Sequence, residues 1–166
     1  GRLRLSPVGG FNANNAEAHN CRVYTYDGQI YEGTIQLADA SLHVNKEYST
    51  TQRTFQSVEV VLDEPVTSKD DVKALGITNG CFVCADPNLV VTNSGYIKSR
   101  FLDDKLSAAI LLGYAKYIRE NNITPLRKVY QHMTVFEEVG HGACASIPED
   151  VSELLCVDMG CVGDGL

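Results

Sequence analysis

The sequence has no tryptophan, an excess of acidic over basic residues, and no long apolar run. Its 166 residues include 14 Lys and Arg against 21 Asp and Glu, a formal net charge of −7. A basic face for nucleic acid is therefore not expected. No apolar run approaches the roughly 20 residues of a membrane-spanning helix. The first ten residues, GRLRLSPVGG, lack the apolar core of a signal peptide, so no membrane partner is expected either.

The six cysteines show no spacing typical of a disulfide framework, which favours reduced thiols and a cytoplasmic location. Cys81 and Cys84 form a C-x-x-C pattern inside GCFVCADP, which we expect to be a strand. Residues three apart on a strand point to opposite faces, so these two cysteines cannot coordinate the same metal ion. We expect two small buried side chains instead.

The first 92 residues are predicted to form an all-β domain. The run CRVYTYDGQIYEGTI indicates a hairpin, because two β-rich stretches flank an Asp-Gly pair that favours a type I′ turn. Residues 57–62 and 80–85 are expected to be further strands, and SKDDVKALGI offers a short helix with Ser68 as its N-cap. Short strands separated by Gly and Asn turns suggest a small barrel or sandwich.

The periodicity changes in the second part of the chain. Apolar residues recur at spacings of three and four from Asp104 to Asn121, which predicts an amphipathic helix. Residues 129–135 are predicted to be a strand, followed by a short helix after Pro148 and a further strand at LLCVD. This order indicates a piece of an α/β layer. The predicted fold class is therefore α/β plus all-β, with domains at 1–92 and 93–166.

Carboxylates stand at the ends of three of these segments. Asp103-Asp104 begins the helix, Glu137-Glu138 follows the first strand, and Asp158 ends the second. Ligands of open α/β sheets gather at the carboxyl ends of strands, so these segments are candidates for a metal site. Each group alone also has an ordinary explanation as an N-cap, a solvated surface or a turn. Chemistry alone leaves both interpretations open.

Three motifs in this order, SRFLDDK, FEEVGHGA and LLCVDMGCVGDG, resemble those of the dinuclear metalloaminopeptidases known as glutamyl and deblocking aminopeptidases, which form tetrahedral dodecamers. PVGGFNANNAEAHNCRVYTYDGQIYEGTI also resembles the small β-barrel domain inserted into their catalytic domain. The resemblance implies that residues 1–92 form this barrel, which serves dimerisation and substrate access, and that residues 93–166 are part of the catalytic domain. It further implies a peptide substrate, and dimers that assemble into a dodecamer in the complete protein.

The resemblance also implies a role for each acidic residue. Asp103 bridges two divalent metal ions, Glu138 binds one of them, and Asp158 binds the other. Glu137 is the general base, which takes a proton from water and passes it to the leaving amine. Asp104 joins Glu137 among the catalytic residues, and the Asp103–Asp104 peptide bond is expected to be cis.

Three further expectations complete the site. Glu137 and Glu138 can divide their roles because neighbouring side chains in extended backbone point opposite ways. The metal ions are Zn²⁺ or Co²⁺, with Mn²⁺ or Mg²⁺ as alternatives. Gly140 and His141 are candidates for contact with the substrate.

The sequence departs from the family pattern in lacking two histidine ligands, because it starts after the first and stops before the second. Three carboxylates without imidazole form an oxygen site that favours Mg²⁺, Mn²⁺ or Ca²⁺ over Zn²⁺. We therefore expect a truncated or processed piece with an incompletely ligated site. One alternative is a catalytically incomplete fragment that acts only as a β-domain module for assembly or interaction. Another is a glycosidase with Glu137 and Asp103 as its acid pair, although no tryptophan is present to form a sugar platform.

Overall fold

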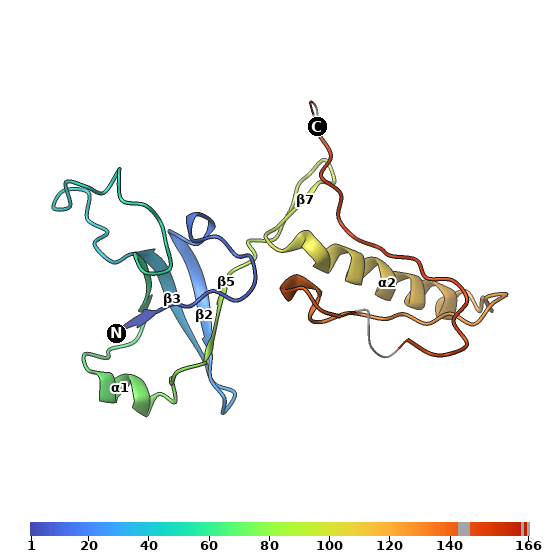
Figure 1. The fold of residues 1–166 in the computed structure, drawn as a ribbon, viewed down its shortest axis with the longest axis horizontal. Helices are drawn as coiled ribbons and strands as arrows, with labels where there is room; N and C mark the ends of the chain where they lie inside the picture. The colour runs from blue at the N-terminus through green and yellow to red at the C-terminus, as the bar shows by residue number, and fades with distance from the viewer. Residues whose placement is uncertain (143–146, 164, 166) are drawn as a thin grey trace. The chain divides into compact units, whose positions relative to one another are not determined.

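The computed structural model describes residues 1–142, 147–163 and 165 of the chain. It divides into two compact parts, Gly1–Asp86 (unit 1) and Pro87–Leu166 (unit 2), and each is described by itself (Figure 1). The structure is mixed α/β, with an antiparallel sheet in unit 1 and a long helix in unit 2.

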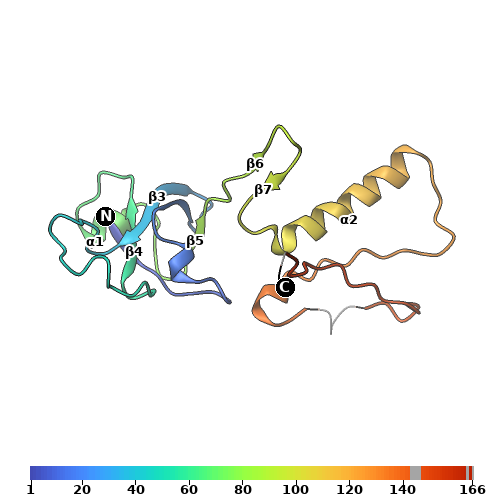
Figure 2. The same ribbon diagram turned by 90° about the horizontal axis from the view of Figure 1, so that it is seen from above.

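Unit 1 is built around a five-stranded antiparallel sheet with the order β1-β4-β3-β2-β5 (Figures 1 and 2). The strands are β1 Arg2–Arg4, β2 His19–Tyr24, β3 Ile30–Leu37, β4 Val58–Leu62 and β5 Phe82–Ala85. The strands predicted at 57–62 and 80–85 are thereby confirmed. Among the residues that the structure describes, no ladder joins the edge strands β1 and β5. The sheet is therefore open, and the expected closure into a barrel is not seen.

The core of unit 1 follows from the alternation of side chains along the strands. Val23, Leu37 and Val60 are at most 1% exposed. Each lies two residues from another buried apolar side chain on its own strand. Burial of a side chain of this size contributes roughly 1.5–3 kcal/mol, so this inner face holds the sheet together.

The predicted hairpin between β2 and β3 is confirmed, but its turn differs from the expectation. The backbone N–H of Gly28 donates to the Thr25 carbonyl at 3.2 Å, and that of Thr25 donates to the Gln29 carbonyl at 3.0 Å. A type I′ turn needs positive φ at two central residues. Here Gly28 has φ 86°, whereas Asp27 is not among the residues with positive φ. The loop therefore has three residues and ends in one left-handed glycine.

The short predicted helix is confirmed as α1, Lys69–Ala74, with Ser68 as its N-cap. The Ser68 hydroxyl accepts from the Asp71 N–H at 3.1 Å, and the Asp71 carboxylate accepts from the Ser68 N–H at 2.8 Å. This reciprocal pair is a capping box. The same carboxylate accepts from the Thr67 N–H at 3.0 Å. These bonds, led by the one from Thr67, lower the pKa of Asp71 to about 2.

Unit 2 contains little regular structure besides one helix. The ladder of β6 Val90–Val91 with β7 Ile97–Lys98 precedes α2, Leu102–Glu120, which confirms the predicted amphipathic helix. A short 3-10 helix, η2, spans Glu137–Val139. No helix in the described part of the chain is long and apolar enough to cross a membrane.

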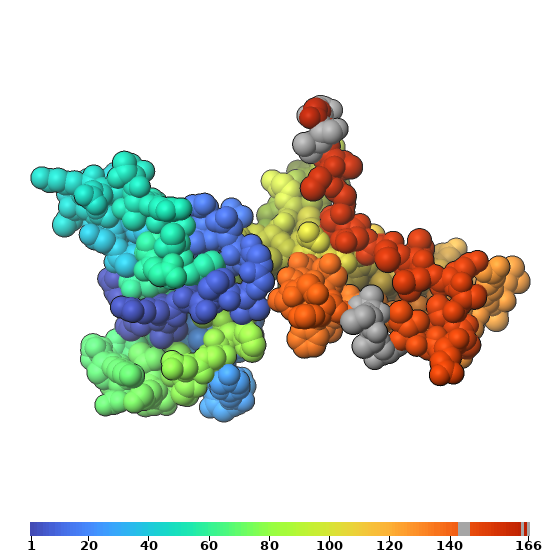
Figure 3. All heavy atoms as spheres, viewed as in Figure 1, coloured from blue at the N-terminus to red at the C-terminus, as the bar shows by residue number. Residues whose placement is uncertain are grey.

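Two predicted strands of unit 2 are not formed. Residues 129–135 and 154–158 belong to no strand, and no ladder joins them within the described residues. Figure 1 shows both segments beside α2, and Figure 2 shows that they diverge from it towards its C-terminal end. An apolar segment becomes a strand only when a neighbour satisfies its backbone groups, and the described residues supply no neighbouring strand for either segment. In the space-filling view the last part of the chain (red) lies at the surface of unit 2 (Figure 3), and Leu155 is 87% exposed.

Side-chain contacts connect residues 128–131 to α2 and to Asp150 instead. The Gln131 side-chain amide donates to the Leu111 carbonyl of α2 at 2.6 Å. The Asp150 carboxylate accepts from Lys128 and from the Tyr130 hydroxyl, both at 2.9 Å. The helix predicted after Pro148 is also wrong, because only a single turn is found, in which the Val151 N–H donates to the Pro148 carbonyl at 3.1 Å.

The described cysteines are free thiols, and Cys144 lies outside the described residues. Cys84 is exposed and Cys81 is half-buried, so the expectation of two buried side chains is wrong. The reason is that Cys84 lies on the same solvent-facing side of β5 as the exposed Phe82, whereas Ala85 faces the core, and Cys81 precedes the strand.

Candidate metal centre

The backbone departs from helical geometry where α2 begins. Phe101 is the N-cap residue with left-handed φ 61° and ψ 29°, and its side chain makes no capping hydrogen bond. Asp103 (φ −80°, ψ 112°) and Asp104 (φ −111°, ψ 30°) are not helical. The peptide bond between them is cis, as the family resemblance implied. Neither aspartate is an N-cap, so that ordinary explanation of this pair does not hold.

Asp103, Asp104 and Asp158 come together at this end of α2. Each offers a carboxylate oxygen, and these atoms all lie within 4.8 Å of one another. Asp103 and Asp158 are exposed, whereas Asp104 is half-buried. Asp158 Oδ1 also accepts from the N–H of Met159 at 2.6 Å, which fixes the orientation of its carboxylate. The structure therefore joins two chain segments that are separated by more than fifty positions in the sequence.

Asp104 contributes a buried carboxylate oxygen to this group. Its Oδ1 is buried and has no hydrogen-bond partner among the described residues. A buried carboxylate oxygen without a donor is costly. Oxygen ligands of this kind suit hard divalent ions such as Mg²⁺, Mn²⁺ or Ca²⁺. The donor set present therefore fits a divalent cation.

Glu137 and Glu138 do not adopt the extended backbone that was expected. Both lie in η2 and are exposed, so alternation along an extended chain does not separate their roles. η2 ends at Gly140, whose φ is 82° and whose N–H donates to the Glu137 carbonyl at 2.8 Å. Gly140 therefore has a conformational role as the residue that ends this turn.

Glu137 lies in the field of the other carboxylates. Desolvation raises its pKa most, and the charges of Glu138, Asp158, Asp103 and Asp104 raise it further, in that order. Like charges disfavour ionisation of a neighbour. All five predicted acidic residues thus belong to one electrostatic cluster, although Glu138 is not part of the three-aspartate group.

The sequence-based roles and the geometry differ in one respect. Asp104 was assigned to catalysis, yet it is Asp104 and not Glu138 that joins Asp103 and Asp158 within ligand distance. His141, the candidate for substrate contact, is exposed just beyond η2, and its N–H donates to the Phe136 carbonyl at 2.9 Å.

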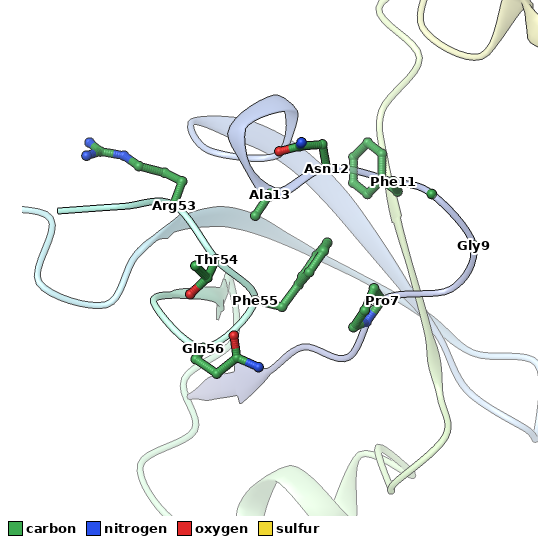
Figure 4. Close-up of a pocket in the computed structure, with 10 residues that line it drawn as sticks. Pro7, Gly9, Phe11, Asn12, Ala13, Arg53, Thr54, Phe55 and Gln56 are labelled. Atoms are coloured by element: carbon green, nitrogen blue, oxygen red, sulfur yellow. The ribbon is translucent and has the colours of Figure 1, made fainter.

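A separate shallow hollow lies in unit 1. It has a volume of about 410 Å³ and is lined by Pro7, Phe11, Arg53, Phe55 and their neighbours. The Phe11 and Phe55 rings are 6.5 Å apart. Figure 4 shows the Arg53 side chain directed away from the Phe55 ring, and its guanidinium pairs with Glu17 at 2.6 Å. The hollow therefore lacks the converging charged groups of the aspartate cluster.

Comparison with known proteins identifies the family. The family model described as M42 glutamyl aminopeptidase matches residues 1–166. The chain therefore belongs to the M42 glutamyl aminopeptidase family. It is 41% identical over 165 residues to "Putative aminopeptidase YhfE" of Bacillus subtilis (strain 168). This match covers 99% of the chain but 48% of the relative, so the chain spans about half the length of that protein.

Two solved structures share the fold. Aminopeptidase APDkam598 from the archaeon Desulfurococcus kamchatkensis has a TM-score of 0.64 and 24% identity, over 84% of this chain and 36% of that one. The TET aminopeptidase from the marine sediment archaeon Thaumarchaeota archaeon SCGC AB-539-E09 has a TM-score of 0.64 and 19% identity, over 84% and 38%. The mixed α/β chain thus corresponds to part of this aminopeptidase fold.

Proposed function

We propose that this chain is the carboxylate-bearing part of a metal-dependent aminopeptidase that removes N-terminal residues from peptides. The observation that carries the proposal is the convergence of Asp103, Asp104 and Asp158 within 4.8 Å in a member of the M42 glutamyl aminopeptidase family. The buried, unpartnered Oδ1 of Asp104 supports it from the structure alone. The five neighbouring carboxylates repel one another unless a cation compensates them.

Asp103, Asp158 and Glu138 are the residues that would hold two divalent ions, and Asp103 would serve both. Asp104 lies close enough to contribute an oxygen as well. Bound divalent ions would supply Lewis acidity and a lowered pKa for water. Zn²⁺ or Co²⁺ is the family-based proposal, whereas the all-oxygen donor set found here favours Mn²⁺ or Mg²⁺.

Glu137 is the proposed general base. Its carboxylate would accept a proton from the attacking water and later donate that proton to the leaving amine. In the metal-free chain, desolvation and the charges of the neighbouring carboxylates raise the pKa of Glu137. The exposed position of Glu137 in η2 leaves it accessible to water.

The remaining parts of the proposal concern substrate, assembly and location. Gly140 and His141 follow Glu137 directly and are proposed to border the bound peptide. Residues 1–92 are proposed as the domain that is inserted in the complete enzyme for dimerisation and substrate access, and residues 93–166 as part of the catalytic domain. Assembly of dimers into a dodecamer and a cytoplasmic location belong to the same proposal.

The test combines metal binding with hydrolysis. Titration of the metal-free chain with Mn²⁺ and Zn²⁺ by calorimetry should show binding that Asp158→Asn weakens strongly. Hydrolysis of aminoacyl-p-nitroanilides, by this chain or by a longer protein that contains it, should stop with EDTA. Glu137→Ala should lower turnover about a hundredfold or more, as expected for loss of a general base.

Lys116→Met is a suitable control, because Lys116 lies on α2 and pairs only at the surface with Glu120 at 3.7 Å. It should change neither metal affinity nor turnover. Turnover that persists in EDTA, or metal binding indifferent to Asp158→Asn, would contradict the proposal.

A further inference from the structure

The backbone at Phe101 is unusual for an aromatic residue. Its φ of 61° and ψ of 29° place it in the left-handed region, which bulky side chains rarely occupy. Such conformations persist where surrounding contacts hold them, and they concentrate at functional sites. Phe101 stands two positions before Asp103, at the point where the chain enters the carboxylate cluster.

Two cations hold the Phe101 ring. The Arg100 guanidinium carbon lies 5.6 Å from the ring centroid, and the Lys105 ammonium lies 5.1 Å from it. Both distances are within the range of cation–π attraction. The Lys105 contact spans the non-helical positions that separate it from Phe101. The contact between Phe101 and Lys105 therefore links the two ends of the non-helical stretch that contains Asp103 and Asp104.

The same cations affect the charge of the site. Lys105 is the next residue after Asp104, and Arg100 precedes Phe101. Their positive charges partly offset the carboxylates in the absence of metal, and by charge alone they oppose the binding of a divalent cation. Removal of Lys105 thus has two effects of opposite sign. Loss of charge strengthens cation binding, whereas loss of the ring contact loosens the two aspartates.

We propose that Phe101 is a positioning residue, whose ring, clamped by Arg100 and Lys105, holds the left-handed turn that brings Asp103 and Asp104 into register with Asp158. The inference rests on the proposed metal-dependent function. It assigns to Phe101 no contact with substrate or metal. Its effect is on how well the ligand oxygens are preorganised, which lowers the cost of binding.

The experiment titrates Co²⁺ into the metal-free 166-residue chain and records calorimetric affinity and the visible absorption bands of the bound ion. Phe101→Leu keeps bulk and charge but removes the π face, and should weaken Co²⁺ binding about fivefold and alter the bands. Phe101→Tyr keeps the ring and should restore both. Phe101→Gly permits the left-handed turn without strain, but it lacks the ring and should bind as weakly as Phe101→Leu.

Lys105→Met should also weaken binding, about threefold, because the lost ring contact outweighs the removed charge. The inference is overturned if Phe101→Leu binds Co²⁺ like the parent chain, if Phe101→Gly retains full affinity, or if Lys105→Met binds more tightly. Asp158→Asn tests the proposed metal site separately from the positioning role of Phe101. If the parent chain binds no Co²⁺, or Asp158→Asn binds it equally well, the proposed function fails, and this inference fails with it.

Discussion

The two units of the chain differ most in what they bury. Among the described residues, all the buried apolar side chains lie in unit 1, from Ala13 to Ala85. In the described part of unit 2, Ser107 is the one buried residue, while Leu126, Leu155 and Val162 are at least 87% exposed. Unit 1 has a five-stranded sheet that satisfies its backbone and permits a core, whereas the described residues of unit 2 form only the short β6–β7 ladder. The carboxylate cluster belongs to the unit with the weaker core.

The two helices also differ in how their N-terminal ends are capped. α1 begins with a capping box in which Ser68 and Asp71 satisfy each other's backbone N–H groups. α2 begins with Phe101 in a left-handed conformation and without a side-chain cap. Local rules are obeyed in unit 1 and broken next to the proposed site, which is where departures from them are expected in functional proteins.

The largest effect should come from truncation of the unit 1 core. Leu37 is 1% exposed on β3, so Leu37→Ala should lower the free energy of unfolding by about 2–5 kcal/mol through lost burial and the cavity left behind. Leu155→Ala in unit 2 removes the same atoms from an 87% exposed position and should change it by about 0.5 kcal/mol or less. Urea unfolding followed by circular dichroism measures both.

Equal losses from these two leucine substitutions would show that unit 2 has a core of its own in solution. The contrast between the units would then be wrong. Unchanged stability in Leu37→Ala would contradict the role of the inner sheet face directly.

Alanine substitutions at two glycines, one in each unit, should change the free energy of unfolding in opposite directions. A Cβ at Gly33 on β3 would lie 2.6 Å from the Val61 carbonyl oxygen and 2.9 Å from a methyl group of Val60. Gly33→Ala should therefore destabilise unit 1 by about 1–3 kcal/mol, because the neighbouring strand must shift. Gly113 lies inside α2 with nothing within 4 Å of a Cβ, so Gly113→Ala should stabilise the helix by about 0.5–1 kcal/mol.

Thermal unfolding of both glycine variants measures whether each substitution raises or lowers stability. A stabilising Gly33→Ala would mean that β3 and β4 are not in close contact. A destabilising Gly113→Ala would mean that this face of α2 is covered in solution.

The sequence was informative wherever structure depends on local pattern. Short stretches of sequence determine the β2–β3 hairpin, the Ser68 cap and the periodicity of α2, and all three were predicted. The strand expected at 129–135 failed because an apolar run shows that a segment can pair but does not supply a partner. The turn at Asp27-Gly28 failed for a subtler reason, since this pair is compatible with more than one loop length.

The structure brings together residues from two of the three motifs that the sequence analysis singled out. Three motifs pointed to Asp103, Glu138 and Asp158, yet the closest grouping contains Asp104 in place of Glu138. Nothing in the sequence indicates that Glu137 and Glu138 lie in a 3-10 turn. The left-handed Phe101 was also missed, and the only available signal was an aromatic residue flanked by basic ones in SRFLDDK.

The smallest expected effect is a pH dependence confined to unit 1. The pKa of Asp71 is lowered to about 2 from 3.8, so between these values the unfolded chain binds more protons than the folded one. The stability that this carboxylate contributes is therefore complete above about pH 4 and is lost as the pH falls towards 2. Asp71→Asn should abolish this part of the pH dependence, so the parent and the variant should converge in stability near pH 2.

Asp70→Asn is the matched control, because Asp70 lies beside Asp71 and bonds at the surface to Lys73 at 3.3 Å. Thermal unfolding from pH 2 to 6 should show a shallower acid-induced loss of stability for Asp71→Asn than for either Asp70→Asn or the parent chain. Parallel curves for all three would show that the Thr67 and Ser68 N–H bonds to Asp71 do not persist in solution. α1 would then lack its capping box, and the difference between the beginnings of α1 and α2 would disappear.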